Sequence, residues 1–204
     1  MNIEPRGSAN GVAEAVSSMP ARRLPGESGV WVFILGDLMV FGLFFLTFAY
    51  YRNENPALYA EAHRSLNQAF GLINTLLLLT SSWFVATAVH TTREGVRKDA
   101  AGLFALALVC GAGFSCIKLL EYGEKIRAGI TLMTNDFFMF YFMFTGIHFA
   151  HVLIGMGVLA YLLAVSRRAE PTARDIVVLE SGGVFWHLVD LLWIVLFALF
   201  YLLA

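Results

Sequence analysis

The sequence predicts an all-α integral membrane protein, built as a bundle of five transmembrane helices. Of its 204 residues, 58% are hydrophobic and only 14% are charged. The mean hydropathy is +0.69, above the range of soluble globular domains. Five apolar runs are long enough to cross about 30 Å of hydrocarbon. The short alternating segments typical of a transmembrane β-barrel do not occur in the sequence, so helices are the expected spanning elements.

The chain divides into a polar N-terminal tail, residues 1–27, and a five-helix domain, residues 28–204. The tail contains glycine, serine, proline and arginine without an apolar run, so we expect a mobile cytoplasmic segment rather than a cleavable signal peptide. Short polar segments join the helices, and neighbouring helices should therefore pack antiparallel. The predicted spans are 29–51, 68–90, 100–121, 135–165 and 179–203.

The distribution of basic residues predicts the orientation in the membrane. Nine lysines and arginines fall on one side, in the tail and in the second and fourth loops, whereas four fall on the other side. Because the cytoplasmic side carries the basic excess, the N-terminus is predicted to be cytoplasmic and the C-terminus external. The formal net charge of −1 offers no basic surface for nucleic acid, which is not an expected partner.

Titratable side chains inside the predicted spans are costly in hydrocarbon and are therefore the first candidates for function. Lys118 and Glu121 are three residues apart and are expected to form an ion pair on one helix. Asn74 is expected to hydrogen-bond to a neighbouring helix. The titratable side chains in the spans are Asp37, Lys118, Glu121, Asp136, His148, His151, His187 and Asp190.

The histidines suggest two readings. His148 and His151 share one helix face, as do His187 and Asp190, and the two faces lie at similar depths. Facing each other, they would offer four ligands for iron, zinc or a haem. The alternative is a hydrogen-bonded polar layer that fixes helix packing and binds no metal. Residue spacing alone leaves both readings open, and it names no reaction.

Five stretches carry a family resemblance, in order along the chain: "WVFILGDLMVFGLFFLTFAYYR", "INTLLLLTSS", "KLLEYGEKI", "FTGIHFAHVLIG" and "FWHLVDLLWIVLFALFYL". From about Leu24 to the C-terminus the chain resembles subunit III of the haem-copper respiratory oxidases, in its five-helix bacterial form. The opening "RLPGESGVWVFILGD" is most similar to the NorE branch, which accompanies bacterial nitric oxide reductases.

This resemblance implies a non-catalytic accessory subunit of the bacterial cytoplasmic membrane. It implies no catalytic, cofactor-binding or metal-binding residue in this chain; haem and copper or iron would belong to the partner, the catalytic subunit I of an oxidase or of a nitric oxide reductase. A structural phospholipid is expected. Asp37 becomes the buried carboxylate near the proton-uptake side or a lipid cleft. The expected internal polar network comprises Asn74, Glu121, His148, His151, His187 and Asp190.

Three functions therefore compete. The first is an accessory subunit that supports assembly, lipid binding, proton uptake and sustained turnover of subunit I, with the NorE-type accessory protein of denitrification as its variant. The second is a stand-alone proton or small-solute carrier that uses Asp37 and the histidines as a relay. The third is a purely structural assembly or lipid-binding factor.

Overall fold

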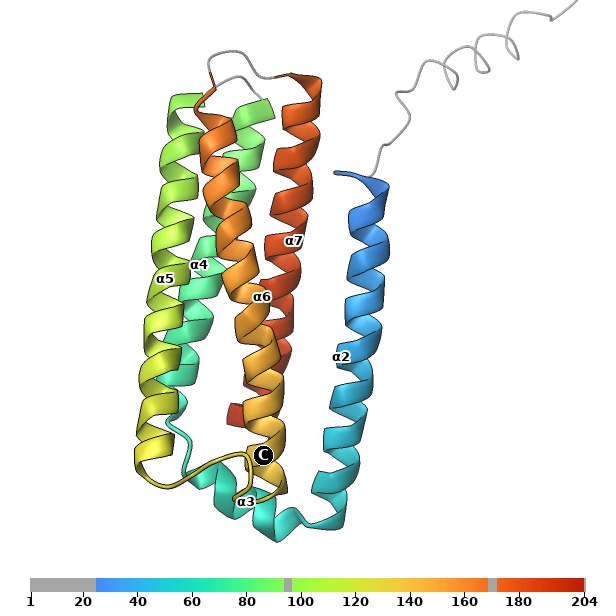
Figure 1. Cartoon of the computed structure of the whole chain (residues 1–204), viewed down its shortest axis with the longest axis vertical. Coiled ribbons are helices and arrows are strands. Elements are labelled where there is room, and N and C mark those ends of the chain that lie inside the picture. The colour runs from blue at the N-terminus through green and yellow to red at the C-terminus, as the bar shows by residue number, and fades with distance from the viewer. Residues whose placement is uncertain (1–24, 94–96, 169–171, 204) are drawn as a thin grey trace, which may run out of the picture.

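The computed structural model of the protein describes residues 25–93, 97–168 and 172–203 (Figure 1). Five of its helices are long and apolar enough to cross a membrane, namely α2, α4, α5, α6 and α7. The predicted all-α five-span architecture is therefore confirmed. Residues 1–24 of the predicted N-terminal tail lie outside the described residues. The elements in chain order are α2 (Ser28–Glu54), α3 (Pro56–Arg64), α4 (Gln68–Arg93), α5 (Arg97–Arg127), α6 (Asp136–Ser166), α7 (Ala173–Phe197) and the π-helical turn η1 (Ala198–Leu202).

The helices extend beyond the apolar runs that predicted them. α5 ends at Arg127 rather than Glu121, and α7 begins at Ala173 rather than Leu179. Apolar residues mark only the hydrocarbon core, whereas a helix can continue through the headgroup layer until a local cap ends it. At the start of α7, Thr172 and the acidic residue three positions later form a reciprocal capping box.

The orientation in the membrane, with a cytoplasmic N-terminus, stays a prediction.

A short helix, α3, occupies the first connecting segment, where the sequence suggested only a polar loop (Figure 1). Pro56 stands at its first position, where the missing N–H is not needed. The ring of Tyr59 packs against Phe48 and Phe137, with centroids 5.3 and 5.6 Å away. Burial and the nearby Asp136 carboxylate raise the pKa of Tyr59 to about 12, so this phenol is an uncharged packing group.

Helices α4, α5, α6 and α7 form a closed ring, in which each helix packs against the one before and the one after it. α2 stands beside this ring and packs mainly against α6, α7 and α3 (Figure 1). α7 is the most buried of the five spans and α2 the least. Two kinds of surface follow from this arrangement: a tightly packed interior within the ring, and a looser junction between α2 and the α6/α7 pair.

Trp186 of α7 is the centre of the ring's closest packing. Its indole lies between two glycines, Gly111 of α5 and Gly155 of α6. A Cβ added at Gly155 would stand 2.8 Å from the indole ring, and one added at Gly111 would stand 3.1 Å from it. Small residues that let neighbours approach closely are the usual solution at membrane helix interfaces. Gly155 therefore has a packing role.

Polar contacts hold the start of α2 against α7. The backbone N–H of Gly26 donates to the Glu180 carboxylate and that of Glu27 donates to the Ser181 hydroxyl, both at 2.9 Å. Gly26 has a φ of +80°, a left-handed conformation in which a side chain would be strained. At the far end of α2, Phe48 is fully buried among aromatic rings. Both ends of α2 are thus held against the rest of the protein.

Candidate functional site

A buried cation, Lys118 of α5, organises one end of the ring. Its side chain is buried. Its Nζ donates to Glu121 Oε2 at 2.9 Å and to the phenol oxygens of Tyr141 and Tyr201, both at 3.1 Å. A lysine ammonium has three N–H donors, so each of them has an acceptor. The ion pair expected from the spacing of Lys118 and Glu121 is present in the structure.

Tyr201 extends this cluster to the C-terminal turn. It lies in η1, and its hydroxyl donates to Glu121 Oε1 at 2.5 Å. Its backbone carbonyl oxygen is 3.1 Å from His63 Nε2 and accepts from Gln68 Nε2 at 3.3 Å. Sequence reasoning missed Tyr141 and Tyr201, which stand 23 and 83 residues from Lys118 along the chain. All three N–H donors of the ammonium are used within the protein. The cluster therefore has a structural role, in which it joins α5 to α6 and η1.

The two histidines of α6 turn to different neighbours. His148 Nε2 lies 2.9 Å from the backbone carbonyl oxygen of Val189 in α7, and its ring contacts Trp193. His151 instead faces α2, with Nε2 3.3 Å from Asp37 Oδ1. The two histidines therefore do not present one common face to His187 and Asp190, as the metal reading would require. Positions three apart differ by about 60° around a helix, and α6 packs against both α7 and α2.

Asp37 of α2 and His151 of α6 form a polar pair across the junction. His151 Nδ1 lies 2.9 Å from the Ile147 carbonyl oxygen, which can only accept, so Nδ1 must carry a hydrogen. The 3.3 Å contact between Nε2 and Asp37 then needs one proton, which sits on the imidazole or on the carboxyl group. Either way the pair has no net charge, which suits its position between α2 and the ring. The second oxygen, Oδ2, is buried without a hydrogen bond to any described residue.

The polar residues of α7 form a separate site with α4. His187 Nδ1 and the hydroxyl of Ser82 are 2.6 Å apart. Asp190, one turn further along α7, is buried beside the same hydroxyl, and its Oδ1 makes no hydrogen bond within the described part of the chain. Sequence spacing placed His187 and Asp190 on one face correctly, but their neighbour is α4 and not α6.

Asn74 does not make the cross-helix bond that was expected of it. Its side chain is fully buried, yet neither amide atom hydrogen-bonds to a residue that the structure describes. At this depth the next residue, Thr75, bonds to α7 instead, since its hydroxyl accepts from the indole N–H of Trp193 at 3.1 Å. A shift of one position turns a helical side chain by about 100°, which is enough to exchange the two roles.

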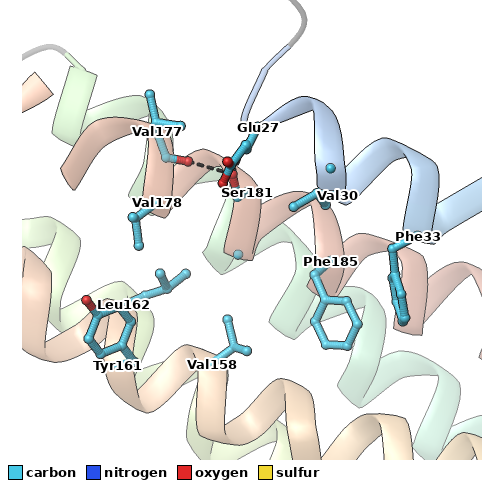
Figure 2. A pocket seen from close by; sticks show the side chains of 12 residues that line it. Glu27, Val30, Phe33, Val158, Tyr161, Leu162, Val177, Val178, Ser181 and Phe185 are labelled. Atoms are coloured by element: carbon cyan, nitrogen blue, oxygen red, sulfur yellow. Dashed lines mark hydrogen bonds between the residues drawn. The ribbon is translucent and has the colours of Figure 1, made fainter. Parts of the chain in front are cut away.

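A groove opens at the junction of α2, α6 and α7. It has a volume of about 510 Å³ and a mainly apolar lining. Figure 2 shows Val30, Phe33 and Phe185 on one side of the hollow, Val178 on the opposite side, and Val158 and Leu162 of α6 below it. We call it the α2/α6/α7 groove; its lining residues are Glu27, Gly29, Val30, Phe33, Val158, Tyr161, Leu162, Val177, Val178, Ser181, Gly182 and Phe185. Sequence patterns could not locate it, because residues that line a groove look like residues that face lipid.

The described side chains do not assemble a metal site. Within residues 25–93, 97–168 and 172–203, no group of three or more His, Cys, Asp or Glu lies close enough to hold an ion. The candidates from the sequence reach three different helices: His148 turns to α7, His151 to α2, and His187 to α4. This donor arrangement corresponds to the polar-layer reading, with each pair joining two helices.

The sequence profile of cytochrome c oxidase subunit III matches residues 24–204. The chain belongs to this family. Subunit III relatives include quinol oxidase subunit 3 of Bacillus subtilis strain 168, 28% identical over 86% of each chain. Cytochrome bo(3) ubiquinol oxidase subunit 3 of Pseudomonas putida is 29% identical over 86% of this chain and 84% of its own. Cytochrome c oxidase subunit 3 of Bacillus sp. strain PS3 is 25% identical over 94% and 95%.

Membership in the subunit III family confirms the resemblance that the five sequence stretches carried. Together with the five spans, it makes the protein a multi-pass protein of the bacterial inner membrane. The named relatives are oxidase subunits, and they favour the oxidase reading over the nitric oxide reductase alternative. Assignment to the NorE branch stays a prediction.

Proposed function

We propose that this subunit III is the accessory subunit of a bacterial haem-copper quinol or cytochrome c oxidase, and that it supports the assembly, proton uptake and sustained turnover of the catalytic subunit I. The observation that carries the proposal is the use of the polar groups within its spans. Lys118, His148 and His187 each bond to a neighbouring helix. Such groups stabilise a scaffold beside a redox centre, which the partner would supply together with its haem and metal.

Purification from native membranes in a mild detergent, with optical spectra of the eluate, tests this function. We expect the chain to elute with a haem-containing subunit whose haem is lost when that partner is removed. Haem bound stoichiometrically by the isolated chain would contradict the accessory role. Proton flux through liposomes that contain the chain alone would favour the stand-alone carrier instead.

The α2/α6/α7 groove is proposed to hold an acyl chain of a structural phospholipid. Its lining is mainly apolar, and a neighbouring hollow that shares Glu27, Val177 and Val178 adds Arg174. An arginine beside an apolar groove suits a phosphate headgroup above an acyl chain.

Filling this groove should expel the lipid. Val178 points into the hollow (Figure 2), so Val178→Trp is expected to lower the phospholipid retained by the purified complex about tenfold, equivalent to about 1.4 kcal/mol of binding free energy. Native mass spectrometry measures the retained lipid. Val109→Trp is the matched control, because Val109 is exposed on α5 and lines no part of the groove. Equal lipid retention in the two variants would contradict the proposal.

Asp37→Asn removes the titratable carboxyl group of the Asp37–His151 pair but keeps a side chain of the same shape. The variant therefore tests the role of the proton apart from the role of the packing contact. The new amide can still donate to His151 Nε2, so we expect the free energy of unfolding to change by no more than about 1 kcal/mol. The variant holds no exchangeable carboxyl proton, and the oxidase is therefore expected to turn over more slowly at alkaline pH. Turnover of the intact complex across pH measures this effect.

The control for Asp37→Asn is Thr47→Val, because the Thr47 hydroxyl donates only to the Leu43 carbonyl oxygen of its own helix. This control should leave the pH profile of turnover unchanged. If Asp37→Asn also leaves it unchanged, the pair contributes only to packing, and the purely structural or lipid-binding role is the better reading.

A further inference from the structure

A second groove runs between α4 and α7, on the outer surface of the ring. It has a volume of about 200 Å³, and we call it the α4/α7 groove. Its middle is made by small residues, Ala86 and Gly183, and its end by the ion pair of Arg93 with Glu180, at 2.6 Å. Its lining residues are Pro25, Ala86, Val89, Arg93, Glu180, Gly183, Val184 and His187.

Two polar side chains lie at this surface near the middle of the membrane. His187 lines the groove about 21 Å from the start of α7, and Trp83 lies about 15 Å from the end of α4, since a helix rises 1.5 Å per residue. Trp83 is 63% exposed, and its indole N–H makes no hydrogen bond with the described residues. Trp83 and Ala86 lie on one face of α4, three positions apart.

This combination is unfavourable against lipid. Tryptophans exposed to lipid concentrate at the membrane–water interface, where the indole N–H reaches water or headgroups. Hydrocarbon chains offer no acceptor to an indole or an imidazole at mid-depth. The exposed residues at the middle of α2 and α5 are apolar by comparison, as Met39, Leu43 and Val109 illustrate. The α4/α7 surface therefore differs from the surfaces that lipid suits.

A transmembrane helix fits this surface better than lipid does. Small residues at Ala86 and Gly183 allow its backbone to approach closely. An acceptor on that helix, such as a hydroxyl, an amide or a free carbonyl oxygen, would satisfy the Trp83 N–H. His187 is already oriented by Ser82 through Nδ1, which leaves the other ring nitrogen for the partner.

We infer that the α4/α7 groove, together with Trp83, is the surface on which a transmembrane helix of the catalytic partner docks, with a hydrogen-bond acceptor at mid-depth. This inference rests on the proposed function, because that function supplies the partner. It adds which face of subunit III meets the partner and which side chains the partner recognises.

Photo-cross-linking in the intact complex tests the docking face. We would introduce p-benzoylphenylalanine in place of Trp83 and, as the control, in place of Val109, which is 67% exposed on α5. Irradiation of native membranes should join position 83, and not position 109, to the haem-containing subunit, as identified by mass spectrometry. Adducts from position 83 with lipid alone, or with a second copy of this chain, would overturn the inference.

A second pair of variants tests the same docking face. Ala86→Trp fills the groove and is expected to reduce the haem that co-purifies with the chain about tenfold, equivalent to about 1.4 kcal/mol. Val109→Trp adds the same bulk to the other face and should leave the haem unchanged. Full haem recovery with Ala86→Trp would overturn the docking face alone. Absence of haem from the complex of the unaltered chain would overturn the proposed function, and this inference with it.

Discussion

Replacement of Lys118 by methionine is expected to destabilise the protein by about 3–5 kcal/mol, the cost of leaving one member of a buried ion pair without the other. Glu121, which is 1% exposed, would keep a carboxylate in the ring without the ammonium that donates to it. The phenols of Tyr141 and Tyr201 would also lose the donor that joins them. SDS titration in mixed micelles, followed by tryptophan fluorescence, gives the free energy of unfolding.

The double variant Lys118→Met with Glu121→Gln is the matched control. It removes both charges and keeps the volume of the two side chains similar, so it should be more stable than the single variant, because replacing a whole buried pair is often neutral. Tyr201→Phe removes one hydroxyl that bonds to both charges and should cost about 1.5–3 kcal/mol. Equal stability of the single and double variants would contradict the idea that an uncompensated Glu121 causes the loss.

The five spans could be predicted because hydrocarbon thickness imposes a minimum length on every apolar run. The Lys118–Glu121 pair could also be predicted, since three positions along a helix bring two side chains together. Its partner Tyr201 could not be. That contact depends on the approach of α7 to α5 and on the π-helical turn η1, and neither has a local signal in the sequence.

The histidines show that residue spacing along the sequence does not predict which helix a side chain contacts. It placed His148 and His151 on similar faces, but the helix on which each face packs depends on the whole bundle. α6 packs against both α7 and α2, so a rotation of about 60° directs one imidazole to Val189 and the other to Asp37. Both grooves escaped prediction for a similar reason, because apolar residues of the sequence do not distinguish a helix neighbour from a lipid neighbour.

Gly155→Ala is expected to destabilise the ring by about 1–3 kcal/mol, the usual cost of overpacking a close contact. The added methyl group would lie 2.8 Å from the ring of Trp186, which would have to move away from α6. The backbone of α5 at Gly111 limits that movement, because it is so close to the same indole that even an added Cβ would stand 3.1 Å from it. Trp186 is thus held between two backbones and cannot yield as a flexible side chain would.

Gly157→Ala is the control for Gly155→Ala, because both glycines lie on α6. A Cβ added at Gly157 meets nothing within 4 Å, so Gly157→Ala should be neutral or stabilise α6 by up to about 1 kcal/mol through its helix propensity. The same SDS titration measures both variants. Since the propensity gain is equal at the two positions, the difference between them isolates the contact with Trp186. Equal effects would mean that Trp186 can shift without cost, and that close glycine packing does not hold α5, α6 and α7 together.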